Sequence, residues 1–401
     1  MSKKNITIIG GGAAGFFAAI NIKQKNPDYH VQIFEKSKTL LGKVRISGGG
    51  RCNVTHACFT PEDLITRYPR GNKELLAPFK RFNSLQTIEW FEKRGILLKT
   101  ESDGRMFPVT DDSETIAGCF IDEAHNRGIP VRRGAGMSSL EKSDDKWKLK
   151  MTDDSNVISD VVIMACGSSQ QTWKILEELG HQIIHPVPSL FTFNTQDERL
   201  SGIPGVSVAE VEIKTNGLKS SGPLLVTHWG LSGPAILKLS AWGARKFSEL
   251  EYRFDISVNF LPGNTAEQIL QKLLGFKTSD SKKTIYAHSR FNIPQRLWEK
   301  LCDASGIQYK LTWADSSKQL LNKLALNLCE SVFKINGKST YKEEFVTAGG
   351  VSLKNIDFKT MESRITPGLF LAGEVLNIDG ITGGYNFQAA WTEAWIISES
   401  V

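Results

Sequence analysis

The residues with the clearest chemistry form a run of glycines near the N-terminus. Gly10, Gly12 and Gly15 fit the pattern G-x-G-x-x-G. They follow an apolar run at 5–9 and precede a helical pattern from about Ala13 to Lys25. In this pattern the first glycine permits a tight turn, the second lets the backbone approach a pyrophosphate, and the third lets helix pack on strand. The helix N-terminus then offers free N–H groups and a positive dipole end, so the motif predicts a phosphate-binding turn.

An acidic residue stands where a dinucleotide site needs one. Glu35 follows Gly15 by 20 residues, at the end of a second expected strand over His30–Phe34. A carboxylate at this place can accept hydrogen bonds from both hydroxyls of a ribose. The glycines, the strand and the acid together predict a β-α-β nucleotide-binding unit, and they leave the choice between NAD and FAD open.

The C-terminal region carries a second candidate nucleotide motif. An apolar strand at 369–372 ends in Gly373 and Glu374, and Gly383–Gln388 then opens an apolar helix over 389–397. This arrangement resembles the second FAD signature of flavoproteins with two dinucleotide-binding folds. The resemblance implies that the acid meets the ribityl chain and that the helix directs its N-terminus at the flavin pyrimidine ring. Such a helix dipole would stabilise negative charge on a reduced flavin, and the alternative is a glycine-rich turn before a core helix.

Three consecutive glycines form a third motif. Gly48–Gly50 are followed directly by Arg51, Cys52 and Asn53. Glycines have almost no bulk, so the backbone here could lie against a flat ring or a phosphate. Arg51 could neutralise a phosphate.

Four motifs make the resemblance specific. They are Ser47–Thr55, Thr227–Pro234, Thr347–Val351 and Gly383–Gln388. Together they resemble the BaiN/RdsA flavoprotein family and span most of the chain. The resemblance implies a two-part FAD domain, an inserted β-barrel-like domain and a helical insert. It also implies NAD(P)H-dependent reduction of conjugated C=C bonds, in bile-acid enones or in a uridine of large-subunit ribosomal RNA that becomes dihydrouridine.

The motifs and the resemblance together predict the residues that contact FAD. Met137 is placed by analogy, where such folds give backbone contacts to adenine. The full set is Gly10, Gly12, Ala14, Gly15, Glu35, Lys36, Lys43, Gly49, Gly50, Arg51, Asn53, Met137, Gly167, Gly373, Glu374, Gly384, Tyr385, Asn386 and Phe387.

Three residues are candidate proton donors. Cys52 lies beside the glycines, His228 precedes a helix-opening Ser-Gly-Pro, and Tyr385 lies in the C-terminal motif. His228 could equally cap a turn. Five residues lie between Cys52 and Cys58, where flavin disulfide reductases have four, and no second G-x-G-x-x-G is present, so a redox disulfide is disfavoured.

The elements that must position these residues indicate an α/β fold. We expect a Rossmann-like FAD-binding domain in two segments, 1–190 and 343–401. Between them we expect a β-rich, barrel-like insertion at 191–262 and a mainly helical insertion at 263–342. The local patterns predict a helix over Glu74–Arg94, broken at Pro78 and around Asn83. Short hairpins over 137–165 fit the small three-stranded insert of flavoprotein domains.

Inside the helical insertion, Phe291 and Trp298 are expected to pack in its core rather than to stack on bases.

Charge is unevenly distributed along the chain. Lys and Arg total 49 against 43 Asp and Glu, a net charge of +6. The segments 66–81 and 277–300 each carry a local charge of +4. Two such segments could form a polyanion-binding face, and with the family resemblance ribosomal RNA is the expected partner. The alternative is a pair of solvated surfaces.

Composition excludes several classes of protein. Hydrophobic residues make up 40%, yet no run approaches the ~20 apolar residues that span a bilayer. The six cysteines form no CxxC pair, so neither zinc nor any other metal is expected and a reducing, cytoplasmic compartment is indicated.

Three hypotheses remain on sequence alone. The chain is a ribosomal RNA dihydrouridine synthase, a reductase of a small enone, or a flavoprotein that binds a partner without turnover. The choice between NADH and NADPH and the oligomeric state stay open.

Overall fold

The structure is a computed structural model that describes residues 3–339 and 346–401. It divides into two units. The first contains Met1–Val187 and Lys342–Val401, and the second contains Pro188–Tyr341. The predicted boundary between residues 342 and 343 lies outside the described residues.

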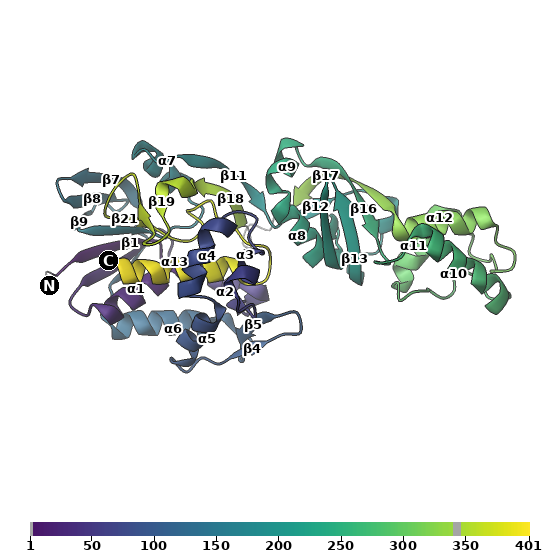
Figure 1. Ribbon diagram of the computed structural model, residues 1–401, viewed down its shortest axis with the longest axis horizontal. Helices are drawn as coiled ribbons and strands as arrows, with labels where there is room; N and C mark the ends of the chain where they lie inside the picture. The colour runs from purple at the N-terminus through teal and green to yellow at the C-terminus, as the bar shows by residue number, and fades with distance from the viewer. Residues whose placement is uncertain (1–2, 340–345) are drawn as a thin grey trace. The chain divides into compact units, whose positions relative to one another are not determined.

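A mainly parallel sheet forms the centre of the first unit (Figure 1). Strand β1 pairs in parallel with β2 and with β10, and Ile8 lies opposite Ile33 and Ile163. Among the described residues seven strands join this sheet, in the order β19, β20, β21, β10, β1, β2, β6. Their bounds are β1 Asn5–Ile9, β2 His30–Glu35, β6 Val131–Arg133, β10 Val161–Met164, β19 Ile356–Asp357, β20 Glu362–Ser363 and β21 Leu369–Leu371.

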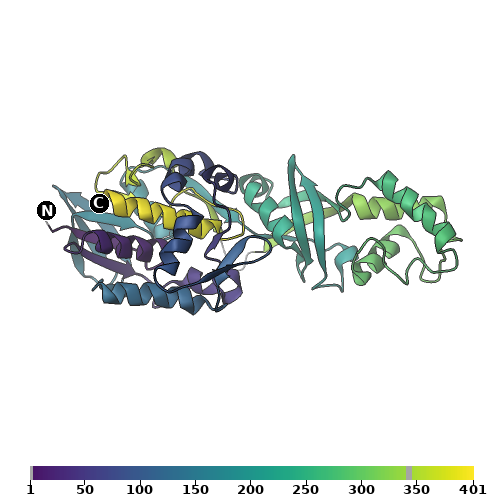
Figure 2. The ribbon, with the colours of Figure 1, turned by 60° about the horizontal axis from the view of Figure 1, so that its bottom comes forward.

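Helices α1 (Ala13–Lys25) and α13 (Tyr385–Ser400) lie side by side, as Figures 1 and 2 show. Helix α1 is buried along Ala14–Ile22 without a polar stripe, as expected of a helix covered on more than one side. The Phe17 ring lies 5.3 Å from the Trp391 ring. This contact packs the first and last long helices of the chain together, and it brings the two predicted FAD motifs into one unit.

Smaller elements surround this core. The three-stranded insert predicted from the hairpins is confirmed as β7-β8-β9. The other elements of the first unit are α2 Gly42–Gly50, β3 Thr55–His56, α3 Pro61–Ile65, α4 Asn72–Arg81, α5 Ser84–Glu92, β4 Leu98–Thr100, β5 Arg105–Pro108, α6 Ser113–Asn126, β7 Met137–Ser143, β8 Lys146–Met151, β9 Asn156–Ser159, α7 Gln170–Glu178, β11 Ile183–Ser189, β18 Val346–Val351 and the 3-10 turn Leu353–Asn355.

The predicted helix at 74–94 is two helices, and only one of the two predicted breaks is correct. Asn83 caps α5, because its side chain accepts from Leu85 N while Gln86 accepts from Asn83 N, each at 2.9 Å. The break predicted at Pro78 is wrong. Helix α4 continues through this proline to Arg81, and Phe82 N still donates to Pro78 O at 3.0 Å. The buried side chains Leu75 and Phe79 hold the helix in place despite the lost N–H.

The second unit contains a closed barrel, as predicted, in which six described strands follow the order β12, β15, β14, β13, β16, β17. Three helices, α10, α11 and α12, lie in the chain between β16 and β17. The bounds are β12 Thr192–Asn194, a 3-10 turn Glu198–Leu200, β13 Ser207–Thr215, β14 Leu218–Val226, β15 Gly230–Ser232, α8 Pro234–Trp242, α9 Ala244–Glu249, β16 Arg253–Asn259, α10 Ala266–Ser279, α11 Gln295–Ser305, α12 Lys318–Cys329 and β17 Ser331–Ser339.

One barrel strand lies in the range expected to be mainly helical. Strand β17 pairs with β16 and β12, and along Ser331–Ile335 buried residues alternate with exposed ones. This alternation is what a barrel wall requires. The helices are therefore inserted within the barrel sequence rather than placed after it.

The core of the second unit confirms two packing predictions. Trp298 is fully buried, and its indole N–H donates to Ile285 O at 2.9 Å. The Phe291 ring lies 6.1 Å from the Phe276 ring. Both aromatic residues are therefore packing residues.

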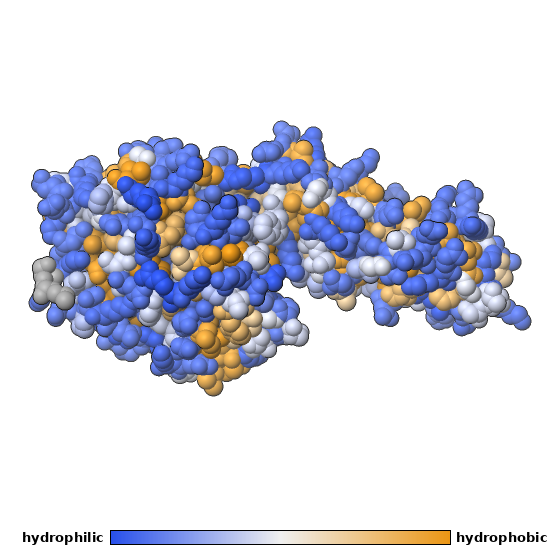
Figure 3. All heavy atoms as spheres, viewed as in Figure 1, coloured by the Kyte–Doolittle hydropathy of each residue, from blue (hydrophilic) through white to orange (hydrophobic). Residues whose placement is uncertain are grey.

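The face shown in Figure 3 is mostly polar, with apolar residues gathered in places. Leu97 and Val109 are two exposed apolar residues near β4 and β5. Within residues 3–339 and 346–401, no helix is long and apolar enough to cross a membrane. The same residues contain no group of histidine, cysteine and acidic side chains able to hold a metal ion.

Candidate functional site

Two glycines of the N-terminal motif are required by packing. Gly10 has φ +117°, and a Cβ there would overlap the carbonyl oxygen of Ala165. A Cβ on Gly15 would overlap the carbonyl oxygen of Gly10. These positions let the β1–α1 turn pass close to β10 and let the helix approach the strand, as the motif predicts.

Gly12 differs because nothing in the protein requires a glycine there. Its φ is −99°, which other residues adopt easily, and no atom of the described residues lies within 4 Å of an added Cβ. The space in front of Gly12 lies at the N-terminus of α1, where backbone N–H groups attract an anion. A pyrophosphate fits both the space and the charge.

The Glu35 carboxylate is held beside this turn by the backbone. One oxygen accepts from Gly11 N and the other accepts from Ser37 N, both at 2.8 Å. Each carboxylate oxygen can accept a further hydrogen bond, so both remain able to bind a ribose hydroxyl. The geometry suits the role predicted for this acid.

We expect Glu35→Ala to weaken FAD binding by roughly 10–150-fold, because hydrogen bonds to a charged acceptor contribute about 1.5–3 kcal/mol. Titration of apoprotein with FAD measures the effect. Glu35→Gln is the matched control, since it keeps the shape of the side chain and an oxygen acceptor, and it should bind FAD more tightly than Glu35→Ala. An unchanged dissociation constant in Glu35→Ala would place the ribose elsewhere.

The C-terminal motif lies next to the N-terminal one. A Cβ on Gly373 would lie 3.6 Å from the Cβ of Ala14, so the end of β21 meets the first turn of α1. Glu374 forms an ion pair with Lys43, and its Oε2 lies 4.0 Å from a Cβ built on Gly167. The ends of β10, β21 and the β1–α1 turn therefore converge, as in α/β sheets that bind ligands at the carboxyl ends of their strands.

The N-terminus of α13 is fixed to the strand that follows the triple glycine. The Asn53 side chain, with its amide oriented by its partners, accepts from Gly384 N and donates to Thr55 O, both at 3.0 Å. The Asn386 side chain accepts from Gly380 N at 2.8 Å and donates to Gly380 O at 3.1 Å. These bonds hold the loop that leads into the helix.

A buried polar network continues this anchor. Gln388 Oε1 accepts from the hydroxyls of Thr55 at 2.6 Å and Thr87 at 2.9 Å. Its amide nitrogen donates to Thr392 Oγ1 at 3.1 Å. Phe387 stacks on Trp391 with ring centroids 5.6 Å apart. Sequence reasoning did not single out Gln388 beyond its place in the motif.

The triple glycine adopts a backbone conformation that favours glycine. Gly48, Gly49 and Gly50 have φ of +60°, +71° and +84°. A Cβ on Gly49 or Gly50 would meet no atom of the described residues within 4 Å, so this backbone is open to a ligand.

Arg51 is engaged by protein groups. Its guanidinium lies 4.0 Å from the Phe107 ring centroid and pairs with Glu101 at 2.6 Å and Asp111 at 3.4 Å. The hydrogen bond to Glu101 raises the pKa of Arg51. A phosphate at this side chain would have to compete with two carboxylates, and its contact with FAD stays a prediction.

Lys36 and Met137 flank the expected adenine position. Lys36 is exposed, and its Cβ would be 3.0 Å from a Cβ on Gly136. Met137 is buried at the start of β7, and its carbonyl accepts from Gln171 Nε2 at 3.2 Å.

The candidate donor Cys52 is a buried thiol. It is fully buried with φ +62°, and burial raises its pKa to about 12. Cys58 is half-buried, and both are free thiols in the described chain. At neutral pH Cys52 therefore holds its proton.

Tyr385 is a second buried donor. Burial raises the pKa of its phenol, and Tyr68 donates its hydroxyl hydrogen bond to Tyr385 O at 2.6 Å. The Tyr385 ring stacks on the His56 ring at 4.8 Å and 19°.

Sequence reasoning missed His56, two residues after Val54 in the family motif. Burial lowers its pKa, and its Nε2 lies 3.1 Å from Asp103 O. Its Nδ1 is buried without a partner among the described residues. The signal was available, because His56 directly follows the motif that ends at Thr55.

His228 lies in the second unit, whereas Cys52 and Tyr385 lie in the first. It is exposed on the β14–β15 turn beside Trp229, which is 61% exposed. The Thr227 hydroxyl oxygen accepts from Trp229 N at 3.3 Å and from Gly230 N at 3.2 Å, which fixes this turn.

The basic segment 66–81 is partly neutralised. Arg70 forms an ion pair with the fully buried Asp379, Lys80 pairs with Glu62 at 3.4 Å, and Arg81 pairs with Glu399 at 2.5 Å. Arg67 and Lys73 are exposed. The net positive charge that this segment exposes to solvent is therefore smaller than the charge counted from its sequence.

The basic segment 277–300 is similar. Asp280 pairs with Lys283 at 2.6 Å and with Arg290 at 3.4 Å. The Arg290 guanidinium also stacks 4.6 Å from the Phe276 ring, so this residue takes part in packing. Lys282 is exposed.

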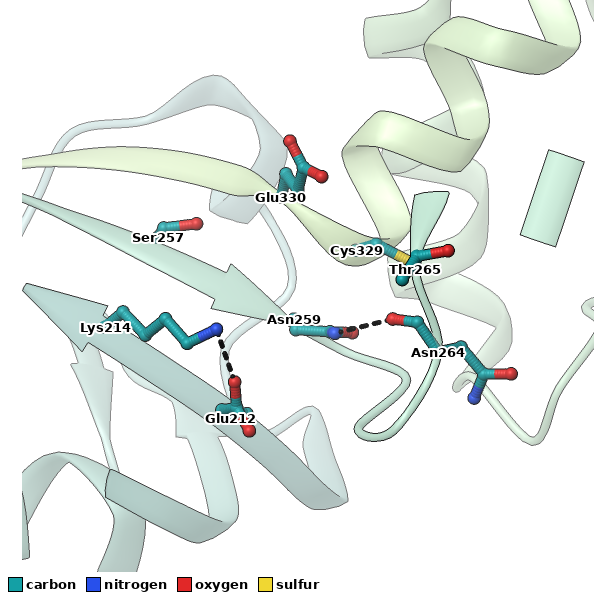
Figure 4. Close-up of a pocket in the computed structure, with 8 residues that line it drawn as sticks. All are labelled: Glu212, Lys214, Ser257, Asn259, Asn264, Thr265, Cys329 and Glu330. Atoms are coloured by element: carbon teal, nitrogen blue, oxygen red, sulfur yellow. Dashed lines mark hydrogen bonds and ion pairs between the residues drawn. The ribbon is translucent and has the colours of Figure 1, made fainter. Parts of the chain in front are cut away.

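A separate polar pocket of about 340 Å³ lies in the second unit, where the barrel meets the helices (Figure 4). Lys214 pairs with Glu212 at 2.8 Å, and Asn259 donates to Asn264 O at 3.1 Å. The lining residues are Glu212, Lys214, Ser257, Asn259, Asn264, Thr265, Cys329 and Glu330. None of the predicted cofactor residues lines it.

Known proteins are similar to this sequence along its length. The family described as HI0933-like protein Rossmann domain matches residues 4–400. The ribosomal RNA dihydrouridine synthase of Escherichia coli (strain K12) is 30% identical over 418 residues, covering 100% of this chain and 98% of that protein. The 3-dehydro-bile acid delta(4,6)-reductase of Clostridium scindens is 26% identical over 411 residues, covering 98% of this chain and 97% of that protein.

Solved structures share the fold. The 3-ketosteroid-delta4-(5alpha)-dehydrogenase of Rhodococcus jostii RHA1 matches with a TM-score of 0.52 at 12% identity, covering 99% of this chain and 97% of that chain. The 3-ketosteroid delta1-dehydrogenase of Sterolibacterium denitrificans matches with a TM-score of 0.50 at 10% identity, covering 100% and 99%. The chain therefore has a Rossmann-like domain with a barrel insertion.

Proposed function

Because this chain belongs to the HI0933-like protein Rossmann domain family, we propose that it is an FAD-dependent oxidoreductase that reduces a carbonyl-conjugated C=C bond with NAD(P)H. The substrate that we propose is a uridine of large-subunit ribosomal RNA, which becomes dihydrouridine. The Escherichia coli relative named ribosomal RNA dihydrouridine synthase, which matches over essentially its full length, supports this substrate class. A cytoplasmic location accompanies the proposal.

The observation that carries the flavin assignment is the space at Gly12. A glycine that the protein itself does not need faces open space at a helix N-terminus, beside an acid held by backbone N–H groups. The C-terminal motif meets this turn through Gly373 and Ala14. Together these residues fit the phosphate and ribose groups of a dinucleotide.

When bound, FAD supplies the hydride transfer from NAD(P)H to the electron-poor carbon, which is C6 of uracil. The chain's own part is to bind and to supply a proton to the neighbouring carbon, C5. The α1 N-terminus holds the pyrophosphate and Glu35 holds the ribose. The α13 N-terminus, anchored through Asn53 and Gln388, stabilises negative charge at its end.

Cys52, His228 and Tyr385 remain the candidate proton donors. Burial raises the pKa of both the Cys52 thiol and the Tyr385 phenol, so both are protonated at neutral pH. Each could therefore donate a proton without first acquiring one. A single substitution at each position, assayed for dihydrouridine formation, separates the three.

The rival substrate is a small enone. The Clostridium scindens relative, named a bile-acid reductase, supports it at 26% identity. A third hypothesis is a flavoprotein without turnover. Anaerobic reduction by NADH or NADPH, followed by reoxidation with a substrate, would exclude the third hypothesis.

Comparison of ribosomal RNA from cells with and without this protein tests the substrate directly. The proposed function predicts that one dihydrouridine disappears from large-subunit RNA and returns when the gene is restored. If ribosomal RNA never reoxidises the reduced protein while a steroid-like enone does so readily, the small-molecule alternative takes its place.

RNA binding through the basic segments makes a further prediction. Lys282→Ala with Lys283→Ala should reduce the slope of log affinity against log salt by roughly 1.4–1.8, because each cation that neutralises a phosphate releases a counterion. Arg290 is left intact because it packs on Phe276. Flavin reduction by NAD(P)H should not change.

The matched control is Lys318→Ala with Lys323→Ala, two exposed residues of α12 outside the basic segment. RNA affinity measured by fluorescence anisotropy over a range of salt concentrations gives both slopes. Equal slopes in the two double variants would remove 277–300 from the RNA-binding surface.

A further inference from the structure

We propose that Glu393 is a positioning residue for the flavin site, whose carboxyl fixes the backbone of Gly373 and thereby sets the place of Glu374. The inference rests on the proposed FAD binding. Glu393 lies within α13, in the apolar run that follows the C-terminal motif. Neither the motifs nor the proposed chemistry gives this side chain a role.

The contact with Gly373 is direct. Glu393 Oε2 accepts from Gly373 N at 2.5 Å, while Gly373 O accepts from Leu376 N at 3.0 Å. Gly373 has φ +80°, so it is also the residue at which the chain turns after β21. The N–H and the C=O of Gly373 are thus both fixed by hydrogen bonds. The next residue is Glu374, the predicted ribityl contact.

Glu393 is buried in a way that costs stability. The side chain is fully buried, and its Oε1 has no partner among the described residues. No lysine, arginine or histidine of the described chain forms an ion pair with it. A buried polar atom left unpaired is costly, and an apolar side chain would avoid that cost. The carboxyl is therefore best explained by what it holds.

The carboxyl is mostly protonated at neutral pH. Burial raises the pKa of Glu393 to about 8, although the hydrogen bond from Gly373 acts in the opposite direction. Among the described residues, the titratable neighbour of Glu393 is the phenol of Tyr68. Burial raises the pKa of Tyr68, and the charge of Glu393 raises it further. As a neutral acid, Glu393 can accept from Gly373 with one oxygen and carry a proton on the other.

Ionisation should oppose FAD binding. The pKa of Glu393 in the fold lies above the ordinary value of 4.5, so the fold binds this proton more tightly than the unfolded chain does. The stabilisation is complete below about pH 4.5 and is lost as the pH rises through about 8. An ionised Glu393 beneath the β21–α1 junction would also repel the pyrophosphate. FAD affinity should therefore fall with rising pH, by up to roughly tenfold per unit above pH 8.

FAD titration of apoprotein from pH 6 to pH 10 tests the proposal. Glu393→Gln keeps the acceptor and carries no charge, so it should bind FAD within about threefold of wild type at pH 7 and show a flatter pH profile than wild type. Glu393→Leu should bind FAD about 10-fold more weakly than wild type at pH 7, because Gly373 N loses its acceptor. Glu399→Gln, on the exposed end of the same helix, is the control and should behave as wild type.

Two outcomes would overturn the proposal. One is a Glu393→Gln variant that loses FAD at pH 7. The other is a pH profile of Glu393→Gln that equals that of wild type. If Glu393→Leu does not fold, the pH profiles of wild type and Glu393→Gln decide alone. A wild-type protein that binds no FAD at any pH would instead refute the proposed function.

Discussion

Replacing Gly12 by valine is expected to abolish FAD binding while the protein still folds. The added side chain would fill the space in front of α1, where no atom of the described residues lies within 4 Å of a Cβ. The backbone tolerates it, because φ is −99°. The branched side chain would therefore meet the cofactor and not the protein. Overpacking of this kind costs about 1–3 kcal/mol before lost phosphate contacts are added, so affinity should fall by ~100-fold or more.

The ratio of bound flavin to protein after purification, together with thermal unfolding of the apoprotein, measures both halves of this expectation. Gly15→Val is the contrasting control, since its side chain would overlap Gly10 O and should prevent folding. A Gly12→Val protein that retains its flavin would show that the pyrophosphate does not lie at this turn.

Replacing Arg70 by methionine should destabilise the first unit by about 3–5 kcal/mol. The guanidinium forms an ion pair with Asp379, which is fully buried, and breaking a buried ion pair is costly because it takes a counter-charge away from the remaining member. For a unit of this size the loss corresponds to a fall in Tm of roughly 6–20 °C.

Differential scanning calorimetry checks this expectation. Arg67→Met is the matched control, because Arg67 lies in the same basic segment and is exposed. The double variant Arg70→Met with Asp379→Leu should recover much of the loss, since it removes both charges. If Arg70→Met and Arg67→Met unfold at the same temperature, the ion pair contributes nothing to stability.

Sequence predicted the parts of the fold that rest on local pattern. The local pattern predicted a strand at 5–9 and, after the glycines, a helix from Ala13. The structure has β1 and α1 at these positions. The break predicted around Asn83 is confirmed, because in the structure this residue caps α5. Pro78 misled because a proline's effect depends on whether the neighbouring turns are held by burial, as Leu75 and Phe79 hold them here.

Long-range contacts were beyond prediction from the sequence. The positive charge around Arg70 was interpreted as charge on the protein surface, because its acidic partner, Asp379, lies 309 residues further along the chain. Glu393 was counted as part of an apolar helix, since nothing in the sequence shows that its carboxyl accepts a hydrogen bond from Gly373 N. Strand β17 was assigned to a helical range because the interruption of a barrel by helices leaves no local mark on its last strand.

The packing of α1 against α13 has a consequence for synthesis. Helix α1 is buried along Ala14–Ile22, yet much of its cover is α13, which begins only at Tyr385. At about 5–20 residues per second, a ribosome takes roughly 20 to 70 s to make the 359 residues between Lys25 and Tyr385. Throughout that time the Phe17 face lacks Trp391 and remains available to chaperones or to other nascent chains. A messenger RNA truncated before the codons of α13 should therefore yield a chain that is degraded, even though most of the nucleotide-binding sequence has been translated.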